Sequence, residues 1–65
     1  MMTENMRIWL KKLYREAAED HLITASNEHL WALGSDNNDI AVRHEQNAEE
    51  HREFAMMLKD LANNI

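Results

Sequence analysis

The residues from 40 to 65 contain the most regular pattern of the sequence, in which selected side chains recur at alternating intervals of four and three. Such intervals place side chains on one side of an α-helix, and their strict alternation is the heptad pattern of helices that pack side by side. The series consists of Ile40, His44, Asn47, His51, Phe54, Leu58, Leu61 and Ile65. It predicts a helix from about Asn37 to Asn63.

A second pattern consists of alanines that recur every seventh residue. The two series are Ala18, Ala25, Ala32 and Ala41, Ala48, Ala55, Ala62. Small side chains let a neighbouring backbone approach closely, so matching series predict two helices packed antiparallel along their alanines. Alanine is also the best helix former, and chance spacing is the alternative. Because both series lie beside an apolar stripe, we favour the interpretation that the alanines lie between the two helices.

The first half of the chain has a less regular apolar stripe. The stripe consists of Met6, Leu10, Leu13 and Ala17, and then, shifted by about one position, of Ala18, Leu22, Ala25, His29 and Leu33. A shift of this kind is typical of an eleven-residue repeat and of a nearly straight helix. We predict one helix from about Thr3 to Leu33 with Thr3 as its N-cap. Thr24, Ser26 and Asn27 are possible caps, which leaves a break at 24–27 as the alternative.

Gly34, the only glycine, separates the two helical patterns, and the chain has no proline. We expect Gly34 to take the left-handed conformation that ends many helices, and Ser35 or Asp36 to cap the second helix. With two helices joined by a turn at 34–37, the predicted fold class is all-α. The predicted structure is a single domain, residues 1–65, folded as a two-helix antiparallel hairpin.

A chain of 65 residues buries barely enough apolar surface to fold alone, and without cysteine it has no disulfide to help. We therefore expect the hairpin to dimerise into a four-helix bundle. The expected hairpin seam consists of Leu10, Leu13, Ala17, Ala25, Ile40, Phe54, Leu58 and Leu61. The expected interface with a second copy or another protein consists of Met2, Trp9, Ile23, Leu30, Trp31, Val42 and Met56.

The middle of the expected seam is polar and consists of His21, His44, Asn47 and His51. Residues equally far from the turn face each other in an antiparallel hairpin, which pairs His21 with His51 and Glu28 with His44. Polar seam residues of this kind set register and partner number. Histidines packed in a seam also favour their neutral form, so we expect pairing to weaken towards about pH 5 to 6.

Four histidines raise the question of a metal site. The Glu-x-x-His motif of carboxylate-bridged bundle sites is absent at all four. His44 and His51 are seven residues apart, which is about 10 Å along a helix and too far to share one ion. The hydroxyl side chains lack a recognisable base and orienting acid, and no glycine-rich phosphate loop is present. We expect no metal, no cofactor and no enzymatic activity.

The net charge of −5 disfavours a general binder of nucleic-acid phosphates. Residues 1–15 form a basic amphipathic segment of the kind that binds anionic membranes, but its apolar side chains are needed to cover the open end of the hairpin. Membrane binding is therefore not expected. The absence of cysteine and of a signal-peptide pattern favours a cytoplasmic location.

In length and architecture the predicted hairpin resembles the Rop type of dimeric helical hairpin, which also has alanine-rich close packing. The resemblance includes no shared motif, and no functional residue follows from it. The expected function is a small non-enzymatic interaction or regulatory module, of a size typical of phage and mobile-element accessory proteins. The alternatives are RNA binding of the Rop type and inhibition of a DNA-binding protein by DNA mimicry. The acids that such mimicry would use are Glu45, Glu49, Glu53 and Asp60.

Overall fold

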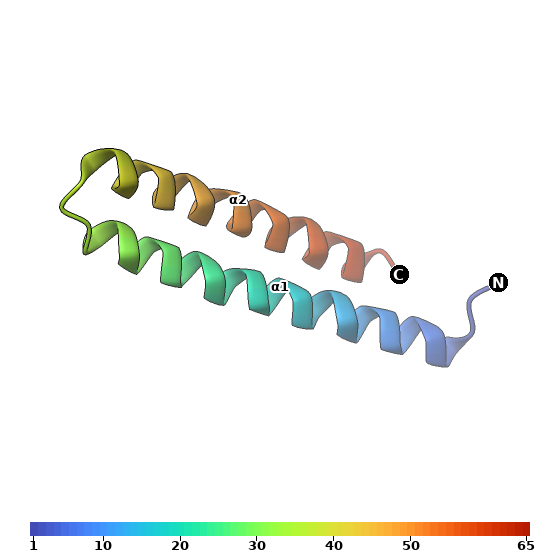
Figure 1. Cartoon of the computed structure of the whole chain (residues 1–65). Helices are drawn as coiled ribbons and strands as arrows, with labels where there is room; N and C mark the ends of the chain where they lie inside the picture. Colours follow the sequence, from blue (N-terminus) through green and yellow to red (C-terminus); the bar gives the residue numbers. More distant parts are fainter.

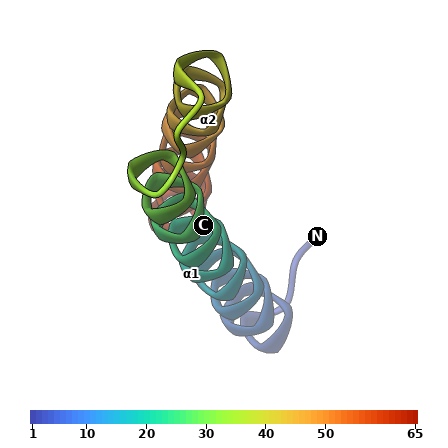
Figure 2. The ribbon, with the colours of Figure 1, turned by 60° about the vertical axis from the view of Figure 1, so that its left-hand side comes forward.

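The computed structural model describes residues 1–65 and contains two helices, α1 (Glu4–Leu33) and α2 (Asn38–Asn63). They run antiparallel and side by side, and the first turns of α1 extend past the C-terminal end of α2 (Figure 1). The hairpin is 52 Å long. The view from the turn in Figure 2 shows a single layer of two helices. The predicted all-α hairpin is thereby confirmed.

Helix α1 is continuous, so the alternative of a break at 24–27 is wrong. The hydroxyl of Thr24 does not cap a helix but donates to the carbonyl oxygen of Asp20, 3.0 Å away within the same helix. Thr3 is the N-cap, as predicted. Its Oγ1 accepts a hydrogen bond of 3.1 Å from the amide of Met6.

The turn differs from the prediction at Gly34. This residue has φ −88° and ψ 0°, a right-handed conformation, and no residue of the chain has a positive φ. Its amide still donates to the carbonyl oxygen of Leu30 at 3.1 Å, so it prolongs the last helical turn. Because the chain leaves the helix without a left-handed residue, the expected left-handed glycine cap is wrong.

The cap of α2 is Asn37 rather than Ser35 or Asp36. The Oδ1 atom of Asn37 accepts from the amides of Asp39 at 2.9 Å and Ile40 at 3.2 Å. The hydroxyl of Ser35 donates instead to the carbonyl oxygen of Asn37 at 3.1 Å, and thus closes the turn. A single asparagine side chain thus satisfies two of the free amides at the start of α2.

The core of the hairpin consists almost entirely of alanine methyl groups. The seven buried residues are Ala18, Ala25, Ala32, Ala48, Ala55, Leu58 and Ala62. Six of them belong to the seven-residue alanine series, which confirms that these series lie between the helices. Tyr14, Ala17 and Leu22 pack against the cluster that Ala18, Ala55 and Leu58 form.

The expected seam is only partly inside the hairpin. Ala25 and Leu58 are buried, and Leu10 and Ala17 are half-buried. The exposed fractions of the other four are 61% for Leu13, 44% for Ile40, 45% for Phe54 and 43% for Leu61. Placing these four inside the single hairpin was therefore wrong. The alanines occupy the line of closest approach, so these four larger side chains lie beside that line and remain partly exposed to solvent.

Neither helix combines the length and the apolar character that crossing a bilayer requires.

Candidate functional site

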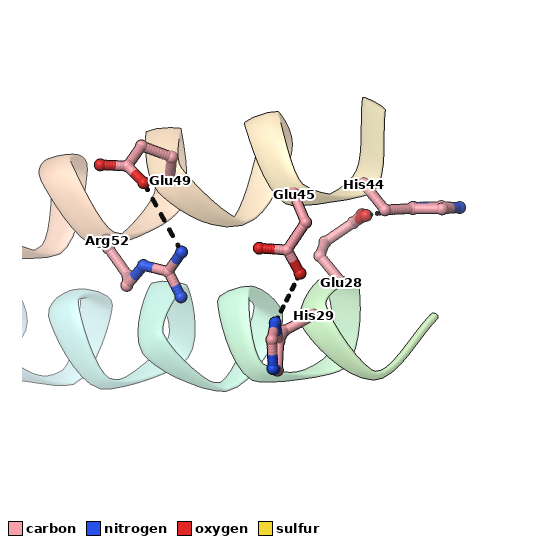
Figure 3. A network of polar contacts seen from close by, with 6 residues as sticks. All are labelled: Glu28, His29, His44, Glu45, Glu49 and Arg52. Atoms are coloured by element: carbon pink, nitrogen blue, oxygen red, sulfur yellow. Dashed lines mark hydrogen bonds and ion pairs between the residues drawn. The ribbon is translucent and has the colours of Figure 1, made fainter. Parts of the chain in front are cut away.

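The line of alanines divides the hairpin into two broad faces. Residues three and four positions after an alanine project to opposite sides of this line. Glu28 and His44, each three positions after an alanine of the series, contact each other on one side. His29 and Glu45, each four positions after an alanine, contact each other on the other side (Figure 3). We call the first side the histidine face and the second the opposite face.

The histidine face contains the heptad series of α2 and the matching residues of α1. Its α1 residues are Leu10, Tyr14, Ala17, His21, Thr24, Glu28 and Trp31, and its α2 residues are Ile40, His44, Asn47, His51, Phe54, Leu58, Leu61 and Ile65. Trp31 lies edge-on to His44, with ring centroids 5.6 Å apart, and Phe54 lies 4.6 Å from His21. The face is therefore apolar towards both ends and polar in the middle.

Charged side chains are almost absent from this face. Of the twelve acids in the chain only Glu28 lies on it, and its one basic side chain is Arg7 at the open end, seven residues before Tyr14 and in a hollow with Ile65. Glu28 is hydrogen-bonded to Nδ1 of His44, the pairing that the distance from the turn predicted. A surface depleted of charge and containing tryptophan and phenylalanine has the composition of an interface core.

His21 and His51 meet at the centre of the histidine face. Their Nδ1 atoms are 2.9 Å apart, their ring centroids are 5.1 Å apart and their ring planes are inclined by 28°, so the two rings meet edge to edge. One Nδ1 carries the proton that the other accepts, so the neutral pair forms one hydrogen bond between the helices. This contact also confirms a pairing predicted from the sequence. The expected loss of pairing in acid stays a prediction.

The opposite face carries charges of both signs. Nδ1 of His29 lies 2.5 Å from Oε1 of Glu45, and Arg52 lies 3.7 Å from Glu49 within α2 (Figure 3). Shallow hollows on this face are lined by His29, Leu33, Val42, Glu45 and Glu49, and by Arg15, Glu19, Leu22, Lys59 and Asn63. Exposed ion pairs of this kind contribute little to stability.

The seven residues expected to form a second apolar surface are all exposed, but they do not form one surface. Trp31 lies on the histidine face, whereas Val42 lines a hollow on the opposite face. Trp9 lines a hollow with residues of α1 only, and Ile23 and Leu30 follow it at seven-residue multiples, on the side away from α2. Met56 shares the side of Val42, and Met2 precedes α1.

The sequence contained the signal for the histidine face, because its α2 half is the four-and-three series from Ile40 to Ile65. The four-and-three spacing predicted that this series lies inside the hairpin. In the structure the alanines take the interior, and the series lies on the adjacent face, where Leu58 is buried and the other side chains are only partly covered.

Within the single chain no three histidine, aspartate, glutamate or cysteine side chains converge to hold a metal ion. No family model, curated protein or solved structure matches the chain. The resemblance to Rop therefore rests on size and helix arrangement.

Proposed function

We propose that the chain is a non-enzymatic interaction module that works as a homodimeric four-helix bundle, with the histidine face as the interface between the two copies. One observation carries the proposal. The hairpin buries six alanines and one leucine, while it leaves Trp31, Phe54 and Leu61 exposed on a nearly uncharged face. A domain this small needs further apolar burial to offset the entropy of ordering its chain.

The shape and size of the histidine face suit a second copy. The hairpin is 52 Å long, and two adjacent helices of about 10 Å diameter make the face on the order of 1,000 Å². A standard interface buries about 800 Å² per partner. Because the face is apolar at both ends and polar in the middle, a two-fold operation places apolar against apolar and polar against polar.

The distribution of charge also favours a second copy as the partner on the histidine face. Each copy has a net charge of −5, and two such copies repel each other at long range. The repulsion is smallest when the surfaces in contact contain few of the acids. The histidine face contains one acid, already bonded to His44, whereas Glu45 and Glu49 lie on the opposite face. Their contacts with His29 and Arg52 also interrupt the acidic surface that mimicry of DNA would require.

The test is the mass of the chain in solution, by analytical ultracentrifugation over a range of concentrations, for two matched variants. Ile40 and Val42 lie two residues apart on α2 with similar exposed fractions, 44% and 49%, but on different faces. We expect Ile40→Glu to weaken the dimer by at least about tenfold, since one buried charge costs more than about 1.4 kcal/mol. Val42→Glu should leave it unchanged.

A wild-type chain that is folded and monomeric at all concentrations would contradict the proposal, as would equal effects of the two variants.

Retention of the chain on immobilised RNA distinguishes the RNA-binding alternative from the proposed dimer. A binder of the Rop type should lose RNA as salt rises and on changing Lys11, Lys12 and Arg15 to alanine. The proposed dimer should form without RNA and be unaffected by those three changes.

A further inference from the structure

The His21–His51 pair places two imidazole nitrogens close together, as half of a metal site would require. The two side chains come from different helices, and their Nδ1 atoms are 2.9 Å apart. Two imidazole nitrogens bound to one tetrahedral zinc ion, at about 2.0–2.1 Å each, are separated by roughly 3.3 Å. To bind an ion the two nitrogens would have to separate by a few tenths of an ångström, and both rings would have to turn so that their lone pairs converge on it. The donor ring would pass its proton from Nδ1 to Nε2, so both rings stay neutral and the proton count is unchanged.

The other histidines are engaged differently. His44 is bonded to Glu28, and His29 to Glu45, each across the two helices. In His21 and His51 two neutral nitrogen ligands face each other instead, with no carboxylate bonded to either. Imidazole pairs without carboxylate favour zinc, copper or nickel over magnesium or calcium.

The missing ligands would come from a second copy. His51 lies at the middle of α2 (Asn38–Asn63), and the pair lies at the centre of the histidine face. A two-fold dimer through this face brings the middle of one hairpin onto the middle of the other, whether the copies run parallel or antiparallel. The pair thus meets its own symmetry copy, and four imidazoles surround one point. Four ligands complete the closed tetrahedral shell of a structural zinc site.

We propose that His21 and His51 of both copies bind one zinc ion on the two-fold axis of the dimer. This inference rests on the dimer proposed above, because the site is incomplete in one chain. The net charge of −5 on each copy favours a divalent cation at the centre of the bundle. The ion would stabilise the dimer relative to the separate hairpins, since only the dimer supplies four ligands.

The experiment uses the full chain, freed of metal by a chelator and dialysed. Native mass spectrometry gives the stoichiometry with Zn²⁺, and Co²⁺ serves as a spectroscopic probe because its visible absorption reports tetrahedral coordination. We expect one ion per two chains, a tetrahedral Co²⁺ spectrum, and a melting temperature that rises with Zn²⁺ but not with Mg²⁺.

Two variants, His21→Phe and His51→Phe, remove the ligand nitrogens while keeping an aromatic ring at each position. Each should lower zinc affinity by at least about 100-fold, more than the 10–100-fold loss typical of an outer-shell partner. His29→Phe is the matched control, since His29 lies on the opposite face, and it should bind zinc as the wild type does.

The outcomes separate the two proposals. The zinc site is overturned, and the dimer proposal is unaffected, if the dimer binds no zinc. The same holds if His29→Phe lowers zinc affinity as much as the His21 and His51 variants do. A folded chain that is monomeric with and without zinc overturns both. One zinc ion per monomer also overturns the shared site. A metal-free monomer that dimerises with one zinc per two chains supports it.

Discussion

Glu28 of α1 and His44 of α2 are joined by a hydrogen bond that crosses the hairpin on its histidine face. The exposed fractions of the two side chains are 14% and 28%. The similar pair on the opposite face, Glu45 and His29, is more exposed, at 43% and 48%. Water competes more strongly for the exposed hydrogen bond, so the two contacts should differ in their contribution to stability.

Removing the two carboxylates separately tests this difference. We expect Glu28→Ala to lower the free energy of unfolding by about 1 kcal/mol and Glu45→Ala by about 0.3 kcal/mol or less. The two substitutions change helix propensity alike, so each is a control for the other. Urea unfolding followed by far-UV circular dichroism measures both. Equal losses would show that burial does not distinguish the pairs, and a double-mutant cycle with His44→Ala isolates the coupling energy.

The close packing of the alanines makes larger side chains unfavourable there. Ala55 is 1% exposed and packs with Ala18 in the centre of the core. We expect Ala55→Leu to destabilise the hairpin by about 1–3 kcal/mol, because the helices must separate to admit the added carbons. Gln46→Leu places the same side chain at an exposed position of α2 and should change stability by less than about 0.5 kcal/mol. A stabilising Ala55→Leu would mean that the helices are not in close contact at this level.

The cap of α2 provides a prediction about the turn. Asn37 accepts two amide hydrogen bonds, whereas Asn38 is the first residue of the helix and its side chain makes no hydrogen bond in the structure. We expect Asn37→Ala to cost about 1 kcal/mol of stability and Asn38→Ala a few tenths at most, on the order of 0.3 kcal/mol. Thermal or urea unfolding of the two variants measures both losses of stability. If Asn38→Ala cost more, the helix would start at a different residue.

The two tryptophans report on the proposed interface from different sides of α1. Trp31 lies on the histidine face beside His44, and Trp9 lies in a hollow that α1 forms alone. In the Trp9→Phe variant we expect the fluorescence of Trp31 to shift to shorter wavelength as the concentration rises and the dimer buries its ring. In the Trp31→Phe variant, the emission of Trp9 should not depend on concentration. The reverse pattern would place the interface on the outer side of α1.

Much of the fold was predictable because helices are governed by local periodicity. Helix ends are encoded by short-range capping chemistry, so Thr3 and the boundary at Leu33 followed from the sequence. The partners His21–His51 and Glu28–His44 also followed, since an antiparallel hairpin with a known turn pairs residues by their distance from it. The sequence did not predict that Asn37 rather than Ser35 caps α2. Several side chains compete for the same free amides, and the path of the turn decides which one accepts from them.

The sequence by itself determined two helices, their alanine lines and the order of facing residues. Only the tertiary structure decided which of two parallel stripes lies inside the hairpin. Alanines let the backbones approach most closely, so they occupy the contact line and displace Ile40, Phe54 and Leu61 to one face. That displacement leaves an apolar face with His21 and His51 at its centre, which we propose a second copy covers. Residue spacing alone predicts both stripes, whereas the distance between the helices selects one.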